Sequence, residues 1–367
     1  MPYEIDFLPV GNGDKSGDAI AVRYGTPGKY TVMVYDGGTK ESGAKLVEHI
    51  KKYYKTDYVD HVVSSHPDAD HASGLSVVLE ELEVGTLWLH RPWKYSNIIL
   101  DYFKDNRITS ASLKARLQEK MSSAYQLEAL ALQKRITIKE PFQGEAIGQF
   151  YVLSPDKDWY IHELIAEFQK SPEQITAEAA LSPAGSLLKL CADALQEGIT
   201  WVADKLEIEH LREDVSTSAE NESSVILYAY IEDPGDGVLL TGDAGIMALE
   251  KAAEYLETNG VSAPAHVKFV QVPHHGSRHN VSGPVLDRML GKRVHEIPSK
   301  FEKYAFISAS KNSTSHPKKV VTNAFYKRGY KPYATQGGTK HHHRGMPDRG
   351  WSSATPIEYS DKVESWD

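Results

Sequence analysis

The stretch VVSSHPDADHASGL, residues 62–75, contains four potential metal ligands within a span of six residues. They are His66, Asp68, Asp70 and His71. Imidazole nitrogens and carboxylate oxygens are common ligands of divalent cations. In a loop between a strand and a helix, His66 and Asp68 can point one way while Asp70 and His71 point another, so the stretch could bind two cations side by side. The alternative reading, a helix-capping Asp70 beside an ordinary loop histidine, leaves this concentration of ligands unexplained.

Two later stretches supply further residues of the same kind. VLLTGDA ends in Asp243, a carboxylate that could bridge two metals, and VQVPHHGSRHN carries His274 and His275. Taken separately, each could be an ordinary turn. Because each follows an apolar run in the same sense as His66 does, we expect all of them on one rim of a sheet.

The single cysteine, Cys191, limits the kind of metal site that the chain can build. One cysteine excludes an internal disulfide and a thiolate cluster, so the ligands must be nitrogen and oxygen. The sequence shows neither the pattern of a signal peptide nor an apolar run long enough to span a membrane. We therefore expect a cytoplasmic protein without membrane contact.

Apolar periodicity predicts an α/β fold in which sheets pack between helices. Alternating apolar positions indicate strands in the first forty residues, a short buried strand ends just before His66, and a helix begins near His71. The last third is rich in strands that alternate with helices. The chain is expected to form a single domain over residues 1–367, with two mostly helical insertions at 96–132 and 157–218 that cap or wall a site.

Six motifs in order make the resemblance to a known family specific. VGNGDKSGDAI with YDGG, SHPDADHASGL, NESSVIL, LLTGDA, VPHHGS and NSTSHP are similar to the motifs of the metallo-β-lactamase fold in its ComEC-like branch of DNA-uptake proteins and their soluble relatives. The resemblance covers roughly residues 3–92, 136–155 and 221–337. Two positions depart from the usual pattern: Asp68 stands where most of the superfamily has histidine, and Asn221 where another histidine is usual.

The resemblance implies an αββα metallo-β-lactamase sandwich and a hydrolase that uses a metal-bridging hydroxide. His66 and Asp68 would hold one ion, Asp70, His71 and one histidine of HHGS the other, and Asp243 would lie between them. Whether His274 or His275 is the ligand stays open. Because carboxylates are harder ligands than imidazole, either Zn²⁺ or Mn²⁺ is expected for the two divalent ions.

Further residues receive roles from the same motifs. His316 is the candidate general acid that protonates the leaving oxygen, with an ordinary loop histidine as the alternative. Ser277 and Asn312 could orient phosphate oxygens. The carboxylates of Asp14 and Asp36 are expected in turns or behind the ligands. The run of histidines at 341–343 is expected in a solvated loop or at a phosphate.

Charge and kinship together favour a phosphodiester substrate, either a nucleic acid or a nucleotide. The chain has a net charge of −9, yet residues 268–350 hold 16 Lys and Arg against 4 Asp and Glu. Such a basic segment suggests a local field for an anion, and Arg278 and Lys318 lie next to the motifs. Two alternatives remain: a hydrolase of a small ester, lactone or thioester on the same fold, and a non-catalytic metal-binding regulatory module.

Overall fold

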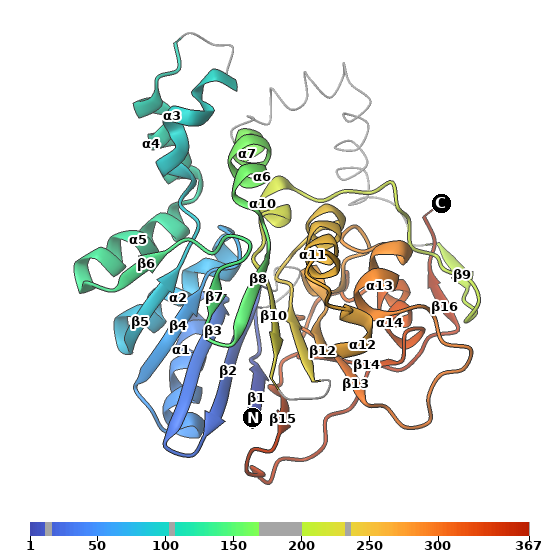
Figure 1. Ribbon diagram of the computed structural model, residues 1–367. Helices are drawn as coiled ribbons and strands as arrows, with labels where there is room; N and C mark the ends of the chain where they lie inside the picture. Colours follow the sequence, from blue (N-terminus) through green and yellow to red (C-terminus); the bar gives the residue numbers. More distant parts are fainter. Residues whose placement is uncertain (12–16, 103–106, 169–199, 232–235, 367) are drawn as a thin grey trace.

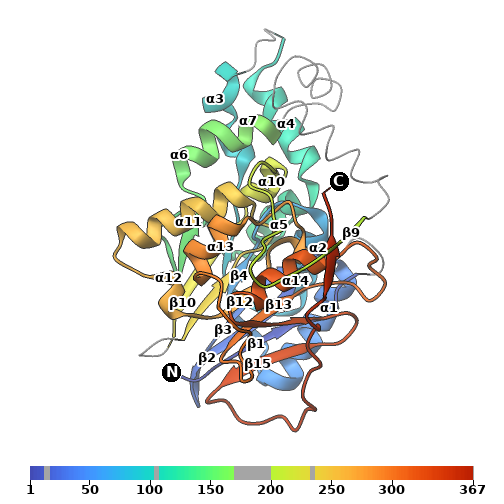
Figure 2. The same cartoon turned by 90° about the vertical axis from the view of Figure 1, so that its right-hand side faces the viewer.

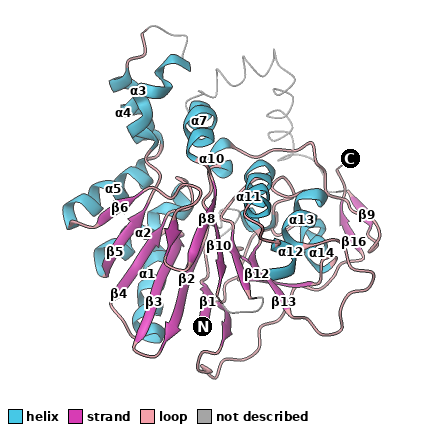
Figure 3. Cartoon of the chain, in the orientation of Figure 1, coloured by secondary structure: helices cyan, strands magenta, loops and turns pink. Residues whose placement is uncertain are grey.

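Two seven-stranded mixed sheets form the centre of the molecule (Figures 1 and 3). The computed structural model describes residues 1–11, 17–102, 107–168, 200–231 and 236–366. The first sheet has the order β15-β1-β2-β3-β4-β5-β6, and β3 to β6 are parallel. Its strands are β1 (Tyr3–Phe7), β2 (Ala19–Thr26), β3 (Lys29–Gly37), β4 (Tyr58–Val63), β5 (Glu83–Trp88), β6 (Thr137–Lys139) and β15 (Lys340–Arg344).

The second sheet repeats this plan with a parallel half and an antiparallel half. Its order is β14-β13-β12-β11-β10-β8-β7, and β11 to β14 are parallel. The strands are β7 (Ala146–Ile147), β8 (Phe150–Ser154), β10 (Ile226–Tyr230), β11 (Gly237–Leu240), β12 (Val267–Gln271), β13 (Lys303–Ile307) and β14 (Tyr330–Ala334). Connections between parallel strands all run in one direction, so the loops after β3, β4, β11 and β12 reach the same edge of the sandwich.

Helices cover the outer face of each sheet, so the layers run helix, sheet, sheet, helix (Figure 1). On the first sheet these are α1 (Lys40–His49), α2 (Ala69–Glu81) and α5 (Ser122–Lys134). On the second they include α11 (Ile246–Thr258), α12 (Ala263–His266), α13 (Gly283–Leu290) and α14 (Lys319–Tyr326). A buried apolar cluster that includes Phe7, Phe150, Leu227 and Phe269 joins the two sheets face to face. The predicted αββα sandwich is therefore confirmed.

The first predicted insertion is helical. Residues 96–132 hold α3 (Ser96–Ile99), α4 (Ser110–Lys120) and most of α5, and α3 and α4 project from the body of the molecule (Figure 1). Lys120 at the end of α4 bonds the carbonyl of Phe168 and the carboxylate of Glu220, at 2.5 and 2.7 Å. This links the first insertion to the second.

The second predicted insertion is helical only in part of its described residues. It begins with α6 (Lys157–Trp159), the π-helical turn Tyr160–Leu164 and α7 (Ile165–Phe168), and residues 169–199 lie outside the described chain. From residue 200 the prediction of helix is wrong, since the chain forms β9 (Trp201–Ala203) and loops before the short α10 (Ala219–Glu222). β9 is extended because it pairs with β16 (Lys362–Glu364), a partner distant in sequence.

The histidine run at 341–343 lies in a strand, which corrects the expectation of a solvated loop. It forms most of β15, which pairs with β1. His342 is packed among aromatic rings, with Phe269 at 4.8 Å, and burial lowers the pKa of His342 to about 3. His341 bonds Asp6 at 2.8 Å. Arg349 also bonds Asp6, so this group of charges fixes β15 and the chain after it to the first sheet.

No helix within the described ranges is both long enough and apolar enough to cross a membrane.

Candidate metal centre

The residues with metal-binding side chains lie where strands end at one edge of the sandwich. Asp36 belongs to the end of β3, and His66 follows β4. Asp68 is the N-cap of α2, which puts His71 in the first turn of that helix as predicted. Asp243 follows β11, and the HHGS loop follows β12.

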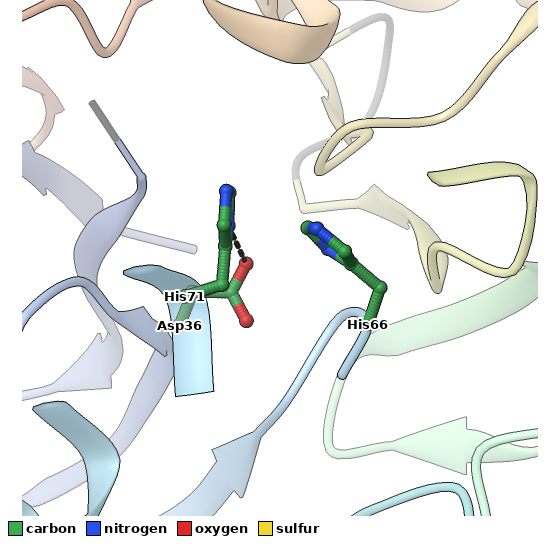
Figure 4. Close-up of side chains that lie close together, drawn as sticks. All are labelled: Asp36, His66 and His71. Carbon is green, nitrogen blue, oxygen red and sulfur yellow. Dashed lines mark hydrogen bonds and ion pairs between the residues drawn. The ribbon is translucent and has the colours of Figure 1, made fainter. Parts of the chain in front are cut away.

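Close packing of α2 on the end of β3 brings Asp36 to His71. A Cβ atom on Gly74 would lie 2.0 Å from the carbonyl oxygen of Gly37, so only glycine permits this approach. Asp36 itself has φ of 57°, in the left-handed region, which turns its carboxylate toward the helix. Figure 4 shows the result, with the Asp36 carboxylate bonded to His71 and the His66 ring facing both.

The buried Asp36 carboxylate fixes the orientation of two histidines. It accepts from the backbone N–H and the hydroxyl of Ser65, at 2.7 and 2.5 Å, and from Nδ1 of His71 at 3.0 Å. Since the Ser65 hydroxyl donates to Asp36, its oxygen must accept from Nδ1–H of His66, 2.8 Å away. In the neutral form of each histidine the proton therefore lies on Nδ1, so that Nε2 offers its lone pair to a cation.

His275 has the same arrangement as these two histidines. Its Nδ1 lies 3.0 Å from the carbonyl oxygen of Ser308, which can only accept, so Nδ1 carries the proton and Nε2 is free. His274 differs, because its Nδ1 faces the side-chain amide of Asn221 at 3.0 Å and its side chain is 28% exposed against 6% for His275. Both residues have left-handed φ values, 46° and 57°. The geometry favours His275 as the ligand.

The free nitrogens converge on one carboxylate oxygen. Oδ2 of Asp243 lies 3.8 Å from Nε2 of His66, 3.3 Å from that of His71 and 3.6 Å from that of His275. Asp36–His66–His71 and His71–Asp243–His275 form two buried groups that share His71. In the described chain, Nε2 of His66, Nε2 of His71 and Oδ1 of Asp243 are buried without a hydrogen-bond partner. Buried polar atoms left in this way fit a site for divalent cations.

The other predicted ligands lie at the margin of these groups. Oδ2 of Asp68 is 3.8 Å from Nε2 of His66, and the Asp68 side chain is 45% exposed. Asp70 is half-buried and belongs to neither group, although its charge acts to raise the pKa of His275. Asn221 contacts His274 and Thr217, so it supports the HHGS loop from the side.

Burial and opposite charge compete at the centre of the cluster. Burial lowers the pKa of His71, but the carboxylates of Asp243 and Asp36 outweigh it and hold that pKa well above its usual range. Burial raises the pKa of Asp243, but His71, His274 and His275 reverse the shift and keep it well below its ordinary value. Without a cation the cluster thus holds a protonated His71 beside an ionised Asp243. A divalent ion that binds here would take the place of the extra proton on His71, so that metal binding would release a proton.

Sequence reasoning missed two buried residues behind the ligands. The Asp18 carboxylate lies 3.6 Å from Nδ1 of His71 and accepts from the Gln271 amide at 2.8 Å. Burial, with the charges of Asp243 and Asp36, raises the pKa of Asp18 to about 8. Gln271 also accepts from the backbone N–H groups of Thr241 and Gly242, which fixes the loop that leads to Asp243. A polar residue at the end of the apolar strand VKFVQ was the available signal for Gln271.

The residues predicted to contact substrate lie on one side of the cluster. The His316 ring is 6.2 Å from that of His274 and nearly parallel to it, and Nδ1 of His316 lies 2.9 Å from the Ser315 hydroxyl. Ser277 is buried and its backbone N–H donates to the carbonyl of His274. The backbone N–H of Lys318 donates to the carbonyl of Gly276 at 3.0 Å. Asn312 is exposed.

Arg278 contacts its own chain. Its guanidinium donates to the carbonyl of Ser365 at 2.6 Å and stacks on Trp366, 4.0 Å from the ring centroid.

Comparisons with known proteins give structural similarities at low sequence identity. No family model matches the sequence, and no curated protein matches it. The metallo-β-lactamase fold protein YhfI from Bacillus subtilis is similar over 93% of this chain and all of its own, with 9% identity and a TM-score of 0.42. A diphosphatase of the PhnP family aligns over 94% and 99% of the two chains, with 10% identity and a TM-score of 0.38. The long form of RNase Z from yeast aligns over 84% of this chain and 37% of its own, with 11% identity and a TM-score of 0.34.

The fold and the cluster together define an αββα sandwich that carries buried His and Asp groups at the edge where its parallel strands end. The two groups are consistent with a site for two divalent metal ions.

Proposed function

We propose that the protein is a divalent-metal-dependent hydrolase and that its substrate is a phosphodiester, as in a nuclease. The observation that supports this most directly is the convergence of three buried imidazoles, each with its Nδ1 proton engaged elsewhere, on Oδ2 of Asp243. Three ligands are oriented in advance around a carboxylate, and the partly exposed His274 lies beside them. Structural metal sites are closed, whereas catalytic sites keep a position open to substrate, so this arrangement resembles a catalytic site.

Some of these residues would bind the cations, and Asp36 would orient the residues that do. His66, His71, His275 and Asp243 would hold the cations, with Asp68 at the margin as a further oxygen ligand. Two divalent cations bound together supply a water of lowered pKa and stabilise the negative charge that develops on attacking and leaving oxygens. Asp36 holds the imidazoles of His66 and His71 in the orientation that binding requires.

In the proposed mechanism His316 donates a hydrogen bond to the leaving oxygen as a neutral imidazole. Burial, together with the positive charge of His275, His274 and Lys318, lowers the pKa of His316 to about 3. The ring is therefore neutral at pH 7. The Ser315 hydroxyl lies beside Nδ1, so it can donate there and leave the proton of His316 on Nε2. In this proposal His316 acts as a neutral hydrogen-bond donor, a weaker role than the general acid that the sequence analysis gave it.

The phosphodiester is favoured by the residues beside the cluster. Ser277 and Lys318 lie in the two loops that meet where the backbone N–H of Lys318 bonds the Gly276 carbonyl, and the charge of Lys318 acts on His316. Lys319 follows directly as the first residue of α14. Two of the six motifs that resemble the ComEC-like branch, VPHHGS and NSTSHP, lie in these same loops. A small ester, lactone or thioester remains the second candidate, since a neutral substrate would need the cations but not the lysines.

One metal-supplemented assay separates these candidates. Purified protein, stripped of metal and reloaded with Mn²⁺ or Zn²⁺, is given oligonucleotides, bis-p-nitrophenyl phosphate, a thioester and a lactone. We expect cleavage of the phosphodiesters and loss of that cleavage in Asp243→Asn. Preference for the thioester or lactone would refute the phosphodiesterase and keep the hydrolase. Metal binding without turnover of any substrate would support a regulatory module.

A further inference from the structure

The residues proposed to bind the cations come from both sheets. His66 and His71 belong to segments of the first sheet, whereas Asp243 and His275 follow β11 and β12 of the second. Of the two buried groups, Asp36–His66–His71 therefore lies on the first sheet alone, while His71–Asp243–His275 joins the two sheets. The second group can hold a cation only if the sheets keep a fixed offset at this edge.

Apolar packing holds the sheets together but does not by itself fix their offset. The two faces meet through a buried cluster of aromatic and aliphatic side chains, with the second sheet in front of the first in Figure 2. Hydrophobic burial has no preferred direction, whereas a hydrogen bond weakens steeply when its donor and acceptor are displaced. Directional contacts between the sheets at the metal edge are therefore expected to set the positions of the ligands.

A buried side-chain hydrogen bond joins the sheets at this edge. Nε2 of Gln271 donates to Oδ2 of Asp18 at 2.8 Å, and both side chains are buried. Asp18 directly precedes β2, whose first residue pairs with Gly37 at the end of β3, and Gln271 is the last residue of β12. The bond thus connects the strand ends next to Asp36 and the HHGS loop.

The amide of Gln271 can take only one orientation. Its Oε1 accepts from the backbone N–H groups of Thr241 and Gly242 at 2.9 and 3.0 Å, and a backbone N–H can only donate. Oε1 must therefore face that loop, and Nε2 must face Asp18. One side chain thus holds the two residues that precede Asp243 and, through Asp18, the first sheet.

Asp18 also reaches the other two members of the group that joins the sheets. Its Oδ2 lies 3.6 Å from Nδ1 of His71. Ser308 follows β13, and its hydroxyl acts to lower the pKa of the Asp18 carboxyl while its carbonyl accepts from Nδ1 of His275. Asp18 is thus connected to His71 directly, to His275 through Ser308, and to the Asp243 loop through the amide described above.

We propose that Asp18 and Gln271 are positioning residues, and that the bond between them holds the sheets at the offset that a cation between His71 and the second sheet requires. The proposal rests on the metal site of the proposed function, and it does not depend on which substrate that site hydrolyses. A cation held by His66 and Asp68 takes these two ligands from the first sheet, so it depends less on the bond. The cation between the sheets loses its geometry when the bond is broken.

The test follows the two metal-binding steps separately. Metal-free full-length protein is titrated with Co²⁺, whose visible absorption bands report its ligands and geometry at each step, and His275→Ala identifies the step of the cation between the sheets. Gln271→Met removes the amide, and Asp18→Ala removes its acceptor. Loss of one group that orients a ligand typically costs about 10–100-fold in metal affinity, so we expect such a fall in this step and less than about threefold in the other.

A conservative variant and a matched control complete the design. Asp18→Asn keeps an oxygen that accepts from Gln271, so it should lose less than about tenfold, the lower end of that range. Tyr330→Phe removes a hydrogen bond of 2.7 Å from the Tyr330 hydroxyl to the carbonyl of Val267, at the other end of β12, where both residues are buried. Tyr330→Phe should lower the melting temperature of the metal-free protein and leave both cobalt steps as in the wild type.

Melting temperatures of the metal-free proteins show which variants are folded, and the two Asp18 variants decide the question if Gln271→Met is not. Unchanged cobalt binding in Asp18→Ala and Gln271→Met would overturn the proposal, as would an equal fall in both steps or in Tyr330→Phe. Equal losses in Asp18→Asn and Asp18→Ala would overturn it as well, because the charge behind His71 would then matter rather than the bond. A wild type that binds two ions but cleaves no phosphodiester would count against the proposed function and leave this inference intact.

Discussion

Replacing Asp36 with asparagine should weaken metal binding without removing any of the proposed ligands. The amide would put an NH₂ group where Oδ2 now accepts from His71 and from the Ser65 hydroxyl. His71 would then turn its Nδ1 lone pair toward the amide and move its proton to Nε2. The Ser65 hydroxyl, now accepting a hydrogen bond from the amide, would donate to Nδ1 of His66 with the same consequence. Two ligands would lose the free lone pair that a cation needs.

The size of the effect follows from the number of ligands involved. Loss of one group that orients a metal ligand typically costs 10–100-fold in affinity, so two affected histidines give a fall on the order of 100-fold, or ~2.7 kcal/mol. Metal at a hundred times its Kd stabilises a folded protein by about 2.7 kcal/mol. A chain of 367 residues unfolds with an entropy of about 0.8 kcal/mol/K, so the metal-induced rise in Tm of roughly 3 °C should almost disappear in the variant.

The assay is thermal unfolding of the metal-free protein with and without Mn²⁺ or Zn²⁺, together with competition against a chromogenic chelator. Asp60→Asn serves as the control, since the Asp60 carboxylate accepts from the backbone N–H of Val32 within the first sheet and touches no histidine of the cluster. An Asp36→Asn protein that binds metal as tightly as the wild type would show that the tautomer argument is wrong. An equal loss in Asp60→Asn would point to general loosening of the sheet.

Three further predictions concern the choice of ligand histidine, the close approach at Gly74 and the buried carboxyl of Glu222. His275→Ala should lower the metal content on elemental analysis and His274→Ala should not; the reverse would assign the ligand to His274. Gly74→Ala should be severely destabilising in thermal unfolding, because its Cβ would lie 2.0 Å from the Gly37 carbonyl oxygen. Burial raises the pKa of Glu222 to about 7 in the folded protein, above its unfolded value, so stability should fall as pH rises from about 4.5 to 7. Glu222→Gln should flatten that slope in pH-dependent urea unfolding.

The ligand-bearing loops could be predicted from sequence because His66 and Asp243 each follow an apolar run that forms a strand. The expectation of one rim of a single sheet was wrong, since His66 follows β4 in the first sheet and Asp243 follows β11 in the second, and the packing of the two sheets brings these strand ends together. The choice between His274 and His275 could not be made, since it depends on a carbonyl of Ser308 in another strand end. Asp36 was expected behind the ligands, but its bond to Ser65 needs the packing of β3 against β4.

The elements that the sequence analysis predicted wrongly are mainly strands that form by pairing with distant parts of the chain. The helical reading of residues 200–218 failed because β9 exists only through its pairing with β16, and three residues carry too little pattern to reveal a strand. The histidine run at 341–343 was placed in a loop because polar residues rarely indicate a strand. The strand forms by pairing with β1, and the His342 ring packs in an aromatic cluster around Phe269 that is assembled from both sheets.

Charge counted along the sequence overstates the field that a substrate would meet. Of the 16 basic residues in 268–350, several form ion pairs with acidic residues, most of which lie outside that segment. They are Arg288 with Glu257, Lys327 with Asp204, Arg328 with Glu209 and Asp287, Arg344 with Asp236, and Arg349 with Glu4 and Asp6. Much of the positive charge of this basic segment is thus used in ion pairs within the protein, and these pairs hold the two sheets and their outer segments together.

Arg278, Lys318 and Lys319 are the basic residues that directly follow the HHGS and SHP motifs in the sequence, and they set an expected salt dependence. Each phosphate neutralised on a single strand contributes about −0.7 to the slope of log K against log salt concentration. Three contacts give a slope of roughly −2, whereas a face carrying all twelve excess charges would give roughly −8. Anisotropy titrations of an oligonucleotide over a range of NaCl concentrations measure this slope directly. A value near −8 would mean that the ion pairs open to receive the substrate. A slope of zero would mean that the protein neutralises no phosphate of the oligonucleotide, which would contradict the proposed contacts.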